Sequence, residues 1–485
     1  MANDALTKEQ QYIAGEYRKS RITRRRLIGQ GIKAGLIGAI SIGYSRFPTL
    51  AFAQGGQYAD HPALKAMKNW KGAPPEPTSP VTVTDWAEAG ERWELPQRAV
   101  YPIWQVVHPN VKIDIVATPI GEMFPKIQLA MASKSNKYGI IDEDYGFLPQ
   151  LISAGHLTNV QPYLDKDPAY RDDLYKDVPE NVLDLWRNKP VKQGGTLHAV
   201  PPDSNCQLFV YRKDVFDKLG IKKLPETWPE TIAVAKELTG SGQYGFTGTL
   251  RRGYWACHVF NTIFWSHGGE WFANGYKEPP TLNTEPAHIA LDIMKKLLPF
   301  GAPGTLNAVD DEANALVTTG TAVMAPSLWG GSVWTSPKTN PKFYDKIGVD
   351  IVPKGSGPNG DRRPIMGGLG LFIPTYAKNK EWAWEWIKFA ASKEVGKEWV
   401  EGLGQPARNS VLKQYSTVQP YFLALAKSLP HAHRMEPIPE TGELYETVGT
   451  ALADVFTGSK SIDDGLKSGQ SAAEDVMRKA GYYKK

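Results

Sequence analysis

The stretch that decides the fold is residues 197–240, LHAVPPDSNCQLFVYRKDVFDKLGIKKLPETWPETIAVAKELTG. An apolar strand is predicted over 197–200, and it stops at Pro201-Pro202 because proline cannot donate to a strand ladder. After a short polar segment, a second strand is predicted over 207–211. A strand that stops and then resumes in this way predicts that the chain crosses between two lobes, with a binding cleft between them.

Two helices follow this crossing. The first is predicted over 213–219 and ends at Gly220, a residue type that commonly terminates helices. Thr227 is predicted to cap the second helix, because Glu230 follows three residues later in the spacing of a capping box. The order of crossing, strand and helices is more informative than any one of its parts.

The chain before this stretch alternates between strands and helices, which predicts β-α-β units around a largely parallel sheet. Ligands of such open sheets bind beyond the carboxyl ends of the strands. The segment 72–80 contains four prolines and is predicted to be irregular. The predicted elements are strands at 81–84, 111–116 and 139–142, and helices at 98–107 and 147–154.

The segments YRKDVFDKLGI and LPETWPE within residues 197–240 resemble the extracellular solute-binding proteins of ABC importers, in the sugar-binding family 1 that includes maltose-binding protein. The resemblance continues in the same order along the chain and covers about residues 78–485. The further matching segments are LNTEP at 282–286, GTAVM at 320–324, GGLGLFIP at 367–374, AWEWI at 383–387 and GYY at 481–483.

The resemblance implies an α/β fold of the type II periplasmic binding protein class, with two lobes, a ligand cleft between them and hinge crossings. Three crossings are implied, near 201–205, 351–353 and 404–409. A few crossing residues then absorb the rotation that closes the cleft. The implied lobes are 78–202 with 354–404 for lobe one, and 206–350 with 410–485 for lobe two.

The N-terminus indicates export. Arg24-Arg25-Arg26 precedes a weakly apolar, glycine-rich run from 29 to 44, and Ala51-Phe52-Ala53 has the small residues of a cleavage site. The run is too short and too polar for a stable membrane helix. Residues 1–53 are therefore predicted to be a twin-arginine signal peptide, residues 54–77 an N-terminal extension, and the protein periplasmic.

Composition argues against nucleic-acid binding. The whole sequence has a formal net charge of +5, but residues 1–53 contain nine Lys or Arg and three Asp or Glu. Without this segment the chain is close to neutral, at about −1. Aromatic residues make up 11%, which suits stacking on sugar rings, although most tryptophans in soluble proteins belong to the core.

The cysteines are Cys206 and Cys257. A twin-arginine substrate folds before export, in a reducing compartment, so we expect two buried thiols. A disulfide formed after export is the alternative.

In lobe one, acidic and aromatic residues follow two predicted strands. Asp85 and Trp86 follow the first, and a carboxylate beside an indole can bind a sugar hydroxyl while the ring covers a C–H face. Asp144 and Tyr145 follow the third, where the resemblance implies ligand contacts. The alternative interpretations are a solvated loop for the first pair and a helix-capping acidic turn for the second.

In lobe two, Arg251 and Trp255 lie where maltose-binding protein carries a ligand-contacting acidic-aromatic loop. Arginine there departs from the family pattern and leaves room for a sugar acid, since guanidinium binds carboxylate through two parallel bonds. Arginine can equally bind neutral hydroxyls. Whether the ligand is neutral or acidic is therefore open.

The resemblance also implies stacking roles for Trp329 and Tyr445. Backbone approach to the ligand is expected at Gly367-Gly368, with an ordinary strand entry as the alternative. Asn205 and Arg408, at the first and third crossings, complete the candidate ligand-binding residues. By contrast, the helical spacing of Trp382, Trp386 and Phe389 predicts core residues.

Catalytic motifs are missing from the sequence: no phosphate-binding loop, zinc-protease helix or nucleophile elbow occurs. His431 and His433 fit a surface turn better than a metal site. We therefore predict a monomeric carbohydrate-binding receptor without cofactor or metal, which docks on the permease of an ABC importer. A secreted glycosidase is the main alternative, and an exported redox protein is a third.

Overall fold

The computed structural model describes residues 58–89, 93–189, 194–329, 331, 335–337 and 339–483. Residues 61–485 form one compact unit, and residues 1–60 form another, of which the turn at 58–60 is described. The signal peptide predicted for residues 1–53 lies outside the described residues. Among the helices that are described, none is long and apolar enough to cross a membrane.

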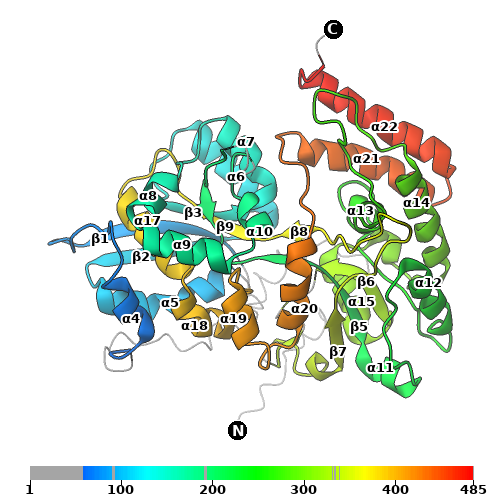
Figure 1. Ribbon diagram of the computed structural model, residues 1–485, viewed down its shortest axis with the longest axis horizontal. Helices are drawn as coiled ribbons and strands as arrows, with labels where there is room; N and C mark the ends of the chain where they lie inside the picture. The colour runs from blue at the N-terminus through cyan, green and yellow to red at the C-terminus, as the bar shows by residue number, and fades with distance from the viewer. Residues whose placement is uncertain are drawn as a thin grey trace, which may run out of the picture. The chain divides into compact units, whose positions relative to one another are not determined.

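The first sheet has the strand order β2-β1-β3-β9-β4, and Figure 1 labels each of these strands except β4. β1 pairs in parallel with both β2 and β3, as predicted. β9 is antiparallel to β3 and to β4, so the prediction of a parallel sheet is wrong there. The reason is that β9 enters the sheet from the second lobe, without a crossover helix. The bounds are β1 Val81–Glu88, β2 Val111–Thr118, β3 Ile140–Asp144, β4 Ala199–Val200 and β9 Leu369–Phe372.

Aromatic side chains join helices to this sheet. The Trp104 indole N–H donates to the Val111 carbonyl oxygen at 2.9 Å, and its ring lies edge-on to Trp386 at 5.5 Å. Trp382, Trp386 and Phe389 are buried, as predicted. The helices of this half are α5 Glu94–Val107, α6 Ile120–Ala132, η1 Tyr145–Phe147, α7 Leu148–Ser153, α8 Gln161–Lys166, α9 Pro168–Asp177, α10 Glu180–Asp184, α17 Lys380–Ala390, η6 Lys393–Val395, α18 Gly396–Glu401 and α19 Asn409–Gln414.

The part of the predicted N-terminal extension from residue 61 onward packs on lobe one. It forms a helix, α4 Pro62–Met67, which buries Ala63, Leu64 and Met67. Beyond α4, the Lys71 backbone N–H donates to Asp167 Oδ2 at 2.9 Å. The predicted irregular stretch at 72–80 contains neither helix nor strand. The sequence did not reveal the docking, because a six-residue helix has too few turns for a clear apolar periodicity.

That segment also helps to cover a buried charge cluster. The Lys388 ammonium is fully buried, 3.1 Å from Glu385 Oε2 and 3.4 Å from Asp167 Oδ2. The same ammonium lies 4.9 Å from the centroid of the Trp70 ring. Removing one partner of such a cluster leaves a buried charge uncompensated, which is costly.

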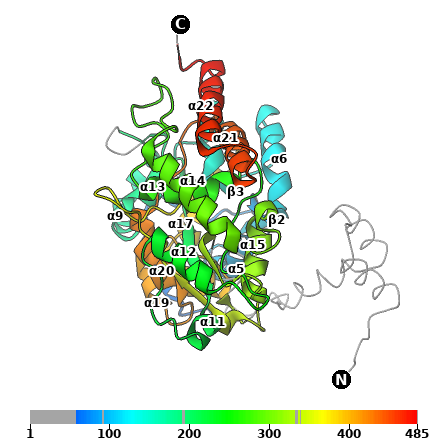
Figure 2. The same ribbon diagram turned by 90° about the vertical axis from the view of Figure 1, so that its right-hand side faces the viewer.

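The second sheet has the order β6-β5-β7, and β8 pairs with the start of β5; all these pairs are antiparallel. The predicted capping box at Thr227 and Glu230 is confirmed. Figure 2 shows α14, α21 and α22 of this half facing the viewer. The strands are β5 Asn205–Arg212, β6 Met324–Trp329, β7 Ile347–Asp350 and β8 Met366–Gly367, and the helices are α11 Lys213–Lys218, α12 Trp228–Glu237, α13 Ala256–Ser266, α14 Glu285–Leu297, η3 Leu298–Phe300, η4 Thr305–Asn307, α15 Asp310–Thr319, η5 Tyr344–Lys346, α20 Tyr421–Ser428, η7 Leu429–His431, α21 Thr441–Phe456 and α22 Ile462–Lys479.

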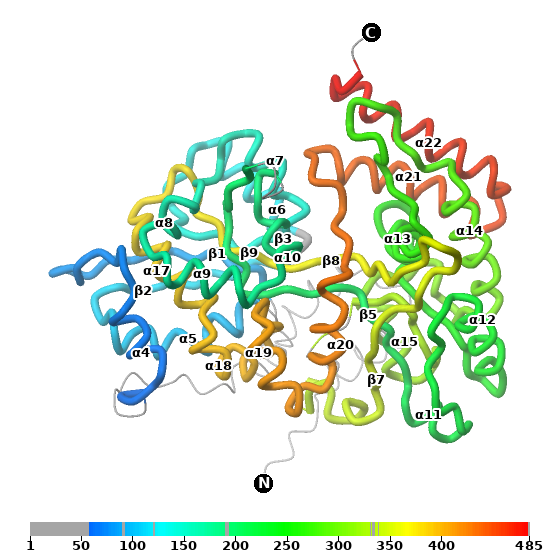
Figure 3. The backbone as a smooth tube through the Cα atoms, viewed as in Figure 1, coloured from blue at the N-terminus to red at the C-terminus, as the bar shows by residue number. Residues whose placement is uncertain are grey.

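The stretches that connect the two sheets lie close together, as the tube in Figure 3 shows near β5, β8 and β9. Asp203 forms an antiparallel bridge with Pro406. Gly368 has φ +146°, and a Cβ there would lie 3.2 Å from the Asp203 carbonyl oxygen. Glycine is favoured at this point, since it fits both the backbone conformation and the close approach.

The sheet pairings move two of the boundaries that we placed from the sequence. Residues 354–367 contact lobe two, since β8 pairs with β5 and the Lys354 N–H donates to the Glu226 carbonyl oxygen at 2.7 Å. The second crossing is therefore at Gly368 and not near 351–353. α19 stays with lobe one, because the Ser410 N–H donates to Asp177 Oδ1 at 2.8 Å.

Candidate functional site

Tyr145 connects the two lobes. It follows β3, and its side chain is 5% exposed. Its hydroxyl donates to the Met366 carbonyl oxygen at 2.8 Å and accepts from the Met435 backbone N–H at 3.3 Å. Met366 lies in β8 of the second lobe, and Met435 follows η7. Both hydrogen bonds therefore hold the lobes together.

A circuit of contacts leads from Met435 back to Met366. The Tyr254 hydroxyl lies 3.4 Å from Met435 Sδ, and the Tyr254 and His258 rings lie 5.1 Å apart. The Trp329 indole N–H in turn donates to His258 Nδ1 at 3.3 Å. Trp329 then packs against Gly367, the neighbour of Met366. We call this set the Tyr145 ring: Tyr145, Tyr254, His258, Trp329, Met366, Gly367 and Met435.

Gly367 has no side chain because the ring leaves no room for one. A Cβ at this position would lie 2.3 Å from Asn205 Oδ1 and 2.8 Å from a carbon of the Trp329 ring. Asn205 opens β5 and pairs with Gly367 across the sheet. The glycine thus brings the Asn205 amide and the Trp329 indole against the backbone of β8.

Three buried polar atoms at the ring have no hydrogen-bond partner within the described residues: Asn205 Oδ1, His258 Nε2 and Tyr445 Oη. Tyr445 adjoins the Tyr145 ring, because its phenol lies 5.7 Å from the phenol of Tyr254. The Tyr445 phenol also stacks on the Trp271 indole at 4.7 Å. Buried polar groups are rarely left unpaired, since each unpaired group costs about 1–3 kcal/mol. A polyhydroxylated ligand would supply the missing partners.

Burial keeps the titratable members of the ring uncharged. It lowers the pKa of His258 to about 3 and raises the pKa of Tyr145 and Tyr254 well above the usual range. Asp144 adjoins Tyr145, and its Oδ1 accepts the Gly146 N–H at 2.7 Å. This is the capping turn that was the alternative interpretation of the sequence, although the cap does not exclude a ligand contact.

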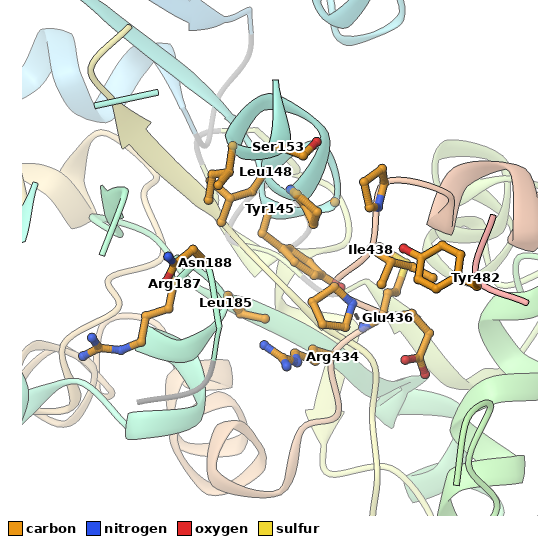
Figure 4. A pocket seen from close by; sticks show the side chains of 16 residues that line it. Tyr145, Leu148, Ser153, Leu185, Arg187, Asn188, Arg434, Glu436, Ile438 and Tyr482 are labelled. Atoms are coloured by element: carbon orange, nitrogen blue, oxygen red, sulfur yellow. Dashed lines mark hydrogen bonds between the residues drawn. The ribbon is translucent and has the colours of Figure 1, made fainter. Parts of the chain in front are cut away.

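A cavity of about 240 Å³ also adjoins Tyr145, between α7 and residues 185–188 of lobe one and residues 434–439 of lobe two. Figure 4 shows Tyr145 at its centre, with Arg434 and Glu436 beside it and the Arg187 guanidinium directed away. The Arg187 Nη1 donates to the Gly195 carbonyl oxygen at 3.0 Å, and the Tyr276 hydroxyl donates to Glu436 Oε2 at 2.9 Å. The cavity and the ring share Tyr145 and Met435.

Asp85 and Trp86 lie inside lobe one, apart from the ring contacts. Asp85 is fully buried and accepts the Trp386 indole N–H at 2.9 Å. Burial raises its pKa to about 7. Trp86 stacks on Tyr138 at 4.1 Å and donates to Thr118 Oγ1 at 3.0 Å. In this structure both residues stabilise the lobe.

Arg408 is also engaged within lobe one. Its guanidinium is 2.8 Å from Asp173 Oδ2, and its Nε donates to the Ala391 carbonyl oxygen at 2.7 Å. Arg251 is exposed, and the neighbouring Arg252 pairs with Asp454 at 2.7 Å. Charge recognition by arginine at the ring therefore has no support in the described contacts.

The remaining predicted residues gather around the ring. Trp255 lies edge-on to His258 at 4.8 Å, and Trp329, Gly367, Asn205, Tyr145 and Tyr445 have the positions given above. Gly368 lies at the crossing. The sequence did not single out Tyr254, His258, Met366 or Met435. A signal was available for the first two, because Tyr254 and His258 flank Trp255 at helical spacing; for the two methionines there was none.

Cys206 and Cys257 are buried and unpaired. In the part of the chain that the structure describes, no group of three or more His, Cys, Asp or Glu side chains is arranged to hold a metal ion.

Comparisons with known proteins agree with this architecture. The mannitol-binding protein of Pseudomonas aeruginosa is 26% identical over 317 residues, which cover 60% of this chain and 71% of the relative. The erythritol/L-threitol-binding protein of Mycolicibacterium smegmatis is 23% identical over 373 residues, which cover 72% and 76%. An ABC transporter solute-binding protein of Agrobacterium radiobacter, solved in complex with ribitol, has a TM-score of 0.70 and 22% identity, covering 83% of this chain and all of its own.

A maltose-bound protein of Thermotoga maritima, with a TM-score of 0.69 and 20% identity, covers 81% of this chain and 99% of its own. These likenesses confirm the predicted two-lobed periplasmic binding protein fold. Residues 105–397, more than half of the chain, match the sequence profile of one family. The protein therefore belongs to the bacterial extracellular solute-binding proteins.

Proposed function

We propose that this protein is the periplasmic binding component of an ABC importer and holds a small neutral polyol between its lobes at the Tyr145 ring. The observation that carries the proposal is the trio of buried, uncharged and unpartnered polar groups of Asn205, His258 and Tyr445. Uncharged hydrogen-bonding groups beside indole and phenol rings suit a ligand that alternates hydroxyls with C–H faces.

Two further observations support a small, neutral ligand. Relatives of this chain are named for mannitol and for erythritol or threitol. The ring itself is tightly packed, since a Cβ at Gly367 would lie 2.3 Å from Asn205 Oδ1 and 2.8 Å from a carbon of the Trp329 ring. An oligosaccharide would require a much wider opening of the lobes than a single polyol.

The mechanism follows from the contacts of Tyr145. With the lobes together, its hydroxyl bonds to Met366 and Met435 of lobe two. A ligand that contacts both lobes binds this closed form better than the open form, and so shifts the population toward it. Rotation about the crossings at Asp203, at Gly368 and after α19 provides the motion. The closed lobes then present one surface to the membrane permease.

The experiment is a thermal-shift screen of the mature protein with D-mannitol, ribitol, erythritol, maltose and D-gluconate. A specific ligand stabilises the folded protein by mass action. We expect a polyol to raise the melting temperature more than D-gluconate does. A response to D-gluconate alone would contradict the neutral ligand, and no response to any polyol would contradict the proposal.

Binding without turnover is part of the proposal. Prolonged incubation with the bound sugar or polyol, followed by chromatography, should return it intact. Cleavage of an oligosaccharide would favour the glycosidase, which needs two carboxyl groups facing one cleft.

Export by the twin-arginine route is proposed from the sequence alone. Arg24 and Arg25 precede a weakly apolar run, as in signals of that route. Changing both to lysine should leave the protein in the cytoplasm, where cell fractionation would find it. Normal periplasmic delivery of the double variant would contradict this route.

A further inference from the structure

We propose that His258 determines ligand specificity, by donating its Nε2–H to a hydroxyl oxygen of the bound ligand, and that Trp329 holds the imidazole in the tautomer this requires. The inference rests on the proposed function and deepens it. It assigns Trp329 a second task besides stacking, the control of a proton on its neighbour.

The tautomer follows from the chemistry of the donor. An indole nitrogen can only donate, so the contact of Trp329 Nε1 with His258 Nδ1 at 3.3 Å requires Nδ1 to be the acceptor. A neutral imidazole carries one proton, which must then lie on Nε2. Burial lowers the pKa of His258 to about 3, so the ring stays neutral in the periplasm.

The Nε2–H then has no partner in the described part of the chain. The His258 side chain is 3% exposed, and its Nε2 atom is buried without a hydrogen bond. The rings around it are those of Tyr254 at 5.1 Å, Trp255 at 4.8 Å and Trp329 at 6.0 Å. These aromatic neighbours offer no acceptor to the N–H, so a ligand bound at the Tyr145 ring would be its hydrogen-bond partner.

A buried donor of this kind selects ligands strongly. A ligand with a hydroxyl at the matching position pairs with the N–H, whereas an analogue without it leaves the N–H buried and unpaired. The acceptor Asn205 Oδ1, on the opposite side of Trp329 beside Gly367, needs a hydroxyl proton in the same way. Together they demand at least two hydroxyls, one as acceptor and one as donor.

The same helix, α13, and the residue after it supply an internal control. His267 Nδ1 lies 2.7 Å from the Ile263 carbonyl oxygen, which can only accept. His267 therefore carries its proton on Nδ1, the reverse of His258. In one NMR spectrum, these two buried histidines, nine residues apart, should therefore show the proton on different nitrogens: on Nε2 in His258 and on Nδ1 in His267.

The first measurement is long-range ¹H–¹⁵N NMR of the histidine-labelled mature protein without ligand. We expect His258 to be the Nε2–H tautomer and His267 the Nδ1–H tautomer. Trp329→Phe, which removes the indole donor, should release His258 from its single tautomer. A wild-type His258 protonated on Nδ1 would overturn the inference, whatever the ligand.

The second measurement is calorimetric titration with D-mannitol, ribitol and erythritol. His258→Asn keeps an acceptor near Nδ1 but has no group at Nε2, and we expect a loss of affinity of roughly 10-fold or more. His258→Gln places an amide N–H near Nε2 and should lose less. Unfolding curves without ligand identify a variant that has lost its fold. The wild-type NMR spectrum tests the contact without any substitution: addition of the polyol that binds should change the ¹⁵N chemical shift of His258 Nε2.

The outcomes separate the two proposals. If the wild type binds a polyol and the ¹⁵N chemical shift of His258 Nε2 does not change, the role of His258 is overturned and the proposed function stands. The same holds if His258→Asn binds the polyol with the affinity of the wild type. Failure of all three polyols to bind the wild type would overturn the proposed function, and this inference with it.

Discussion

Removing one oxygen atom, in Tyr145→Phe, tests whether the ring couples the lobes. In the closed form the Tyr145 hydroxyl bonds to Met366 and Met435, and in an open form it would bond to water. Each bond contributes about 0.5–1.5 kcal/mol net, so the two together stabilise closure by about 1–3 kcal/mol. A tenfold change corresponds to roughly 1.4 kcal/mol, and the expected loss of ligand affinity is therefore about 5- to 150-fold.

The ligand for this test is the polyol that raises the melting temperature most. Calorimetry with it gives the change in affinity. Small-angle X-ray scattering with and without this polyol gives the change in closure of the lobes. We expect the variant to need more ligand for the same compaction. At saturation it should reach the same closed form, because the aromatic contacts are kept.

Tyr138→Phe is the matched control. Tyr138 also belongs to lobe one, where it stacks on Trp86, and among the described residues its hydroxyl takes part in no interlobe hydrogen bond. Loss of its oxygen should leave affinity and compaction unchanged. Equal affinities of Tyr145→Phe, Tyr138→Phe and wild type would refute the coupling, and equal losses in both variants would mean a general effect on lobe one.

Three other predictions concern charge. Lys388→Met should lower the free energy of unfolding by about 3–5 kcal/mol in urea, because Asp167 and Glu385 are left buried without their cation, while the affinity of the folded variant for ligand stays the same. Burial holds the Asp85 pKa at about 7, against 3.8 ordinarily, so the folded protein keeps a proton that the unfolded chain loses, and stability should fall by roughly 1.4 kcal/mol per pH unit between about pH 4 and 7. Asp85→Asn should remove this contribution to the pH dependence of the free energy of unfolding. Parallel plots of the free energy of unfolding in urea against pH, for variant and wild type, would contradict it. Arg251→Gln should bind polyols as the wild type does, since Arg251 is exposed; a tenfold loss in calorimetry would return this arginine to the site.

The sequence predicted those elements well that are determined by residues close together in the chain. The capping box at Thr227 and the stop at Pro201-Pro202 depend on residues only a few positions apart. The direction of β9 and the packing of α4 depend on contacts between distant parts of the chain, so no local pattern could predict them. Asp85 was misplaced for a related reason: a polar residue at a strand end looks like a ligand contact until a distant indole, here Trp386, is found to bond it.

The site residues divide along the same line. A motif can mark Trp329, because an aromatic residue after a strand is visible in the sequence. No motif can mark His258, because its value to a ligand comes from what it lacks: Trp329 occupies Nδ1, and nothing in the described chain occupies Nε2. The same holds for Asn205, whose unpaired amide oxygen lies where a Cβ at Gly367 would clash with it. An unmet hydrogen bond is a property of the folded ring, so a search for orphaned buried polar atoms locates candidate ligand contacts that residue patterns miss.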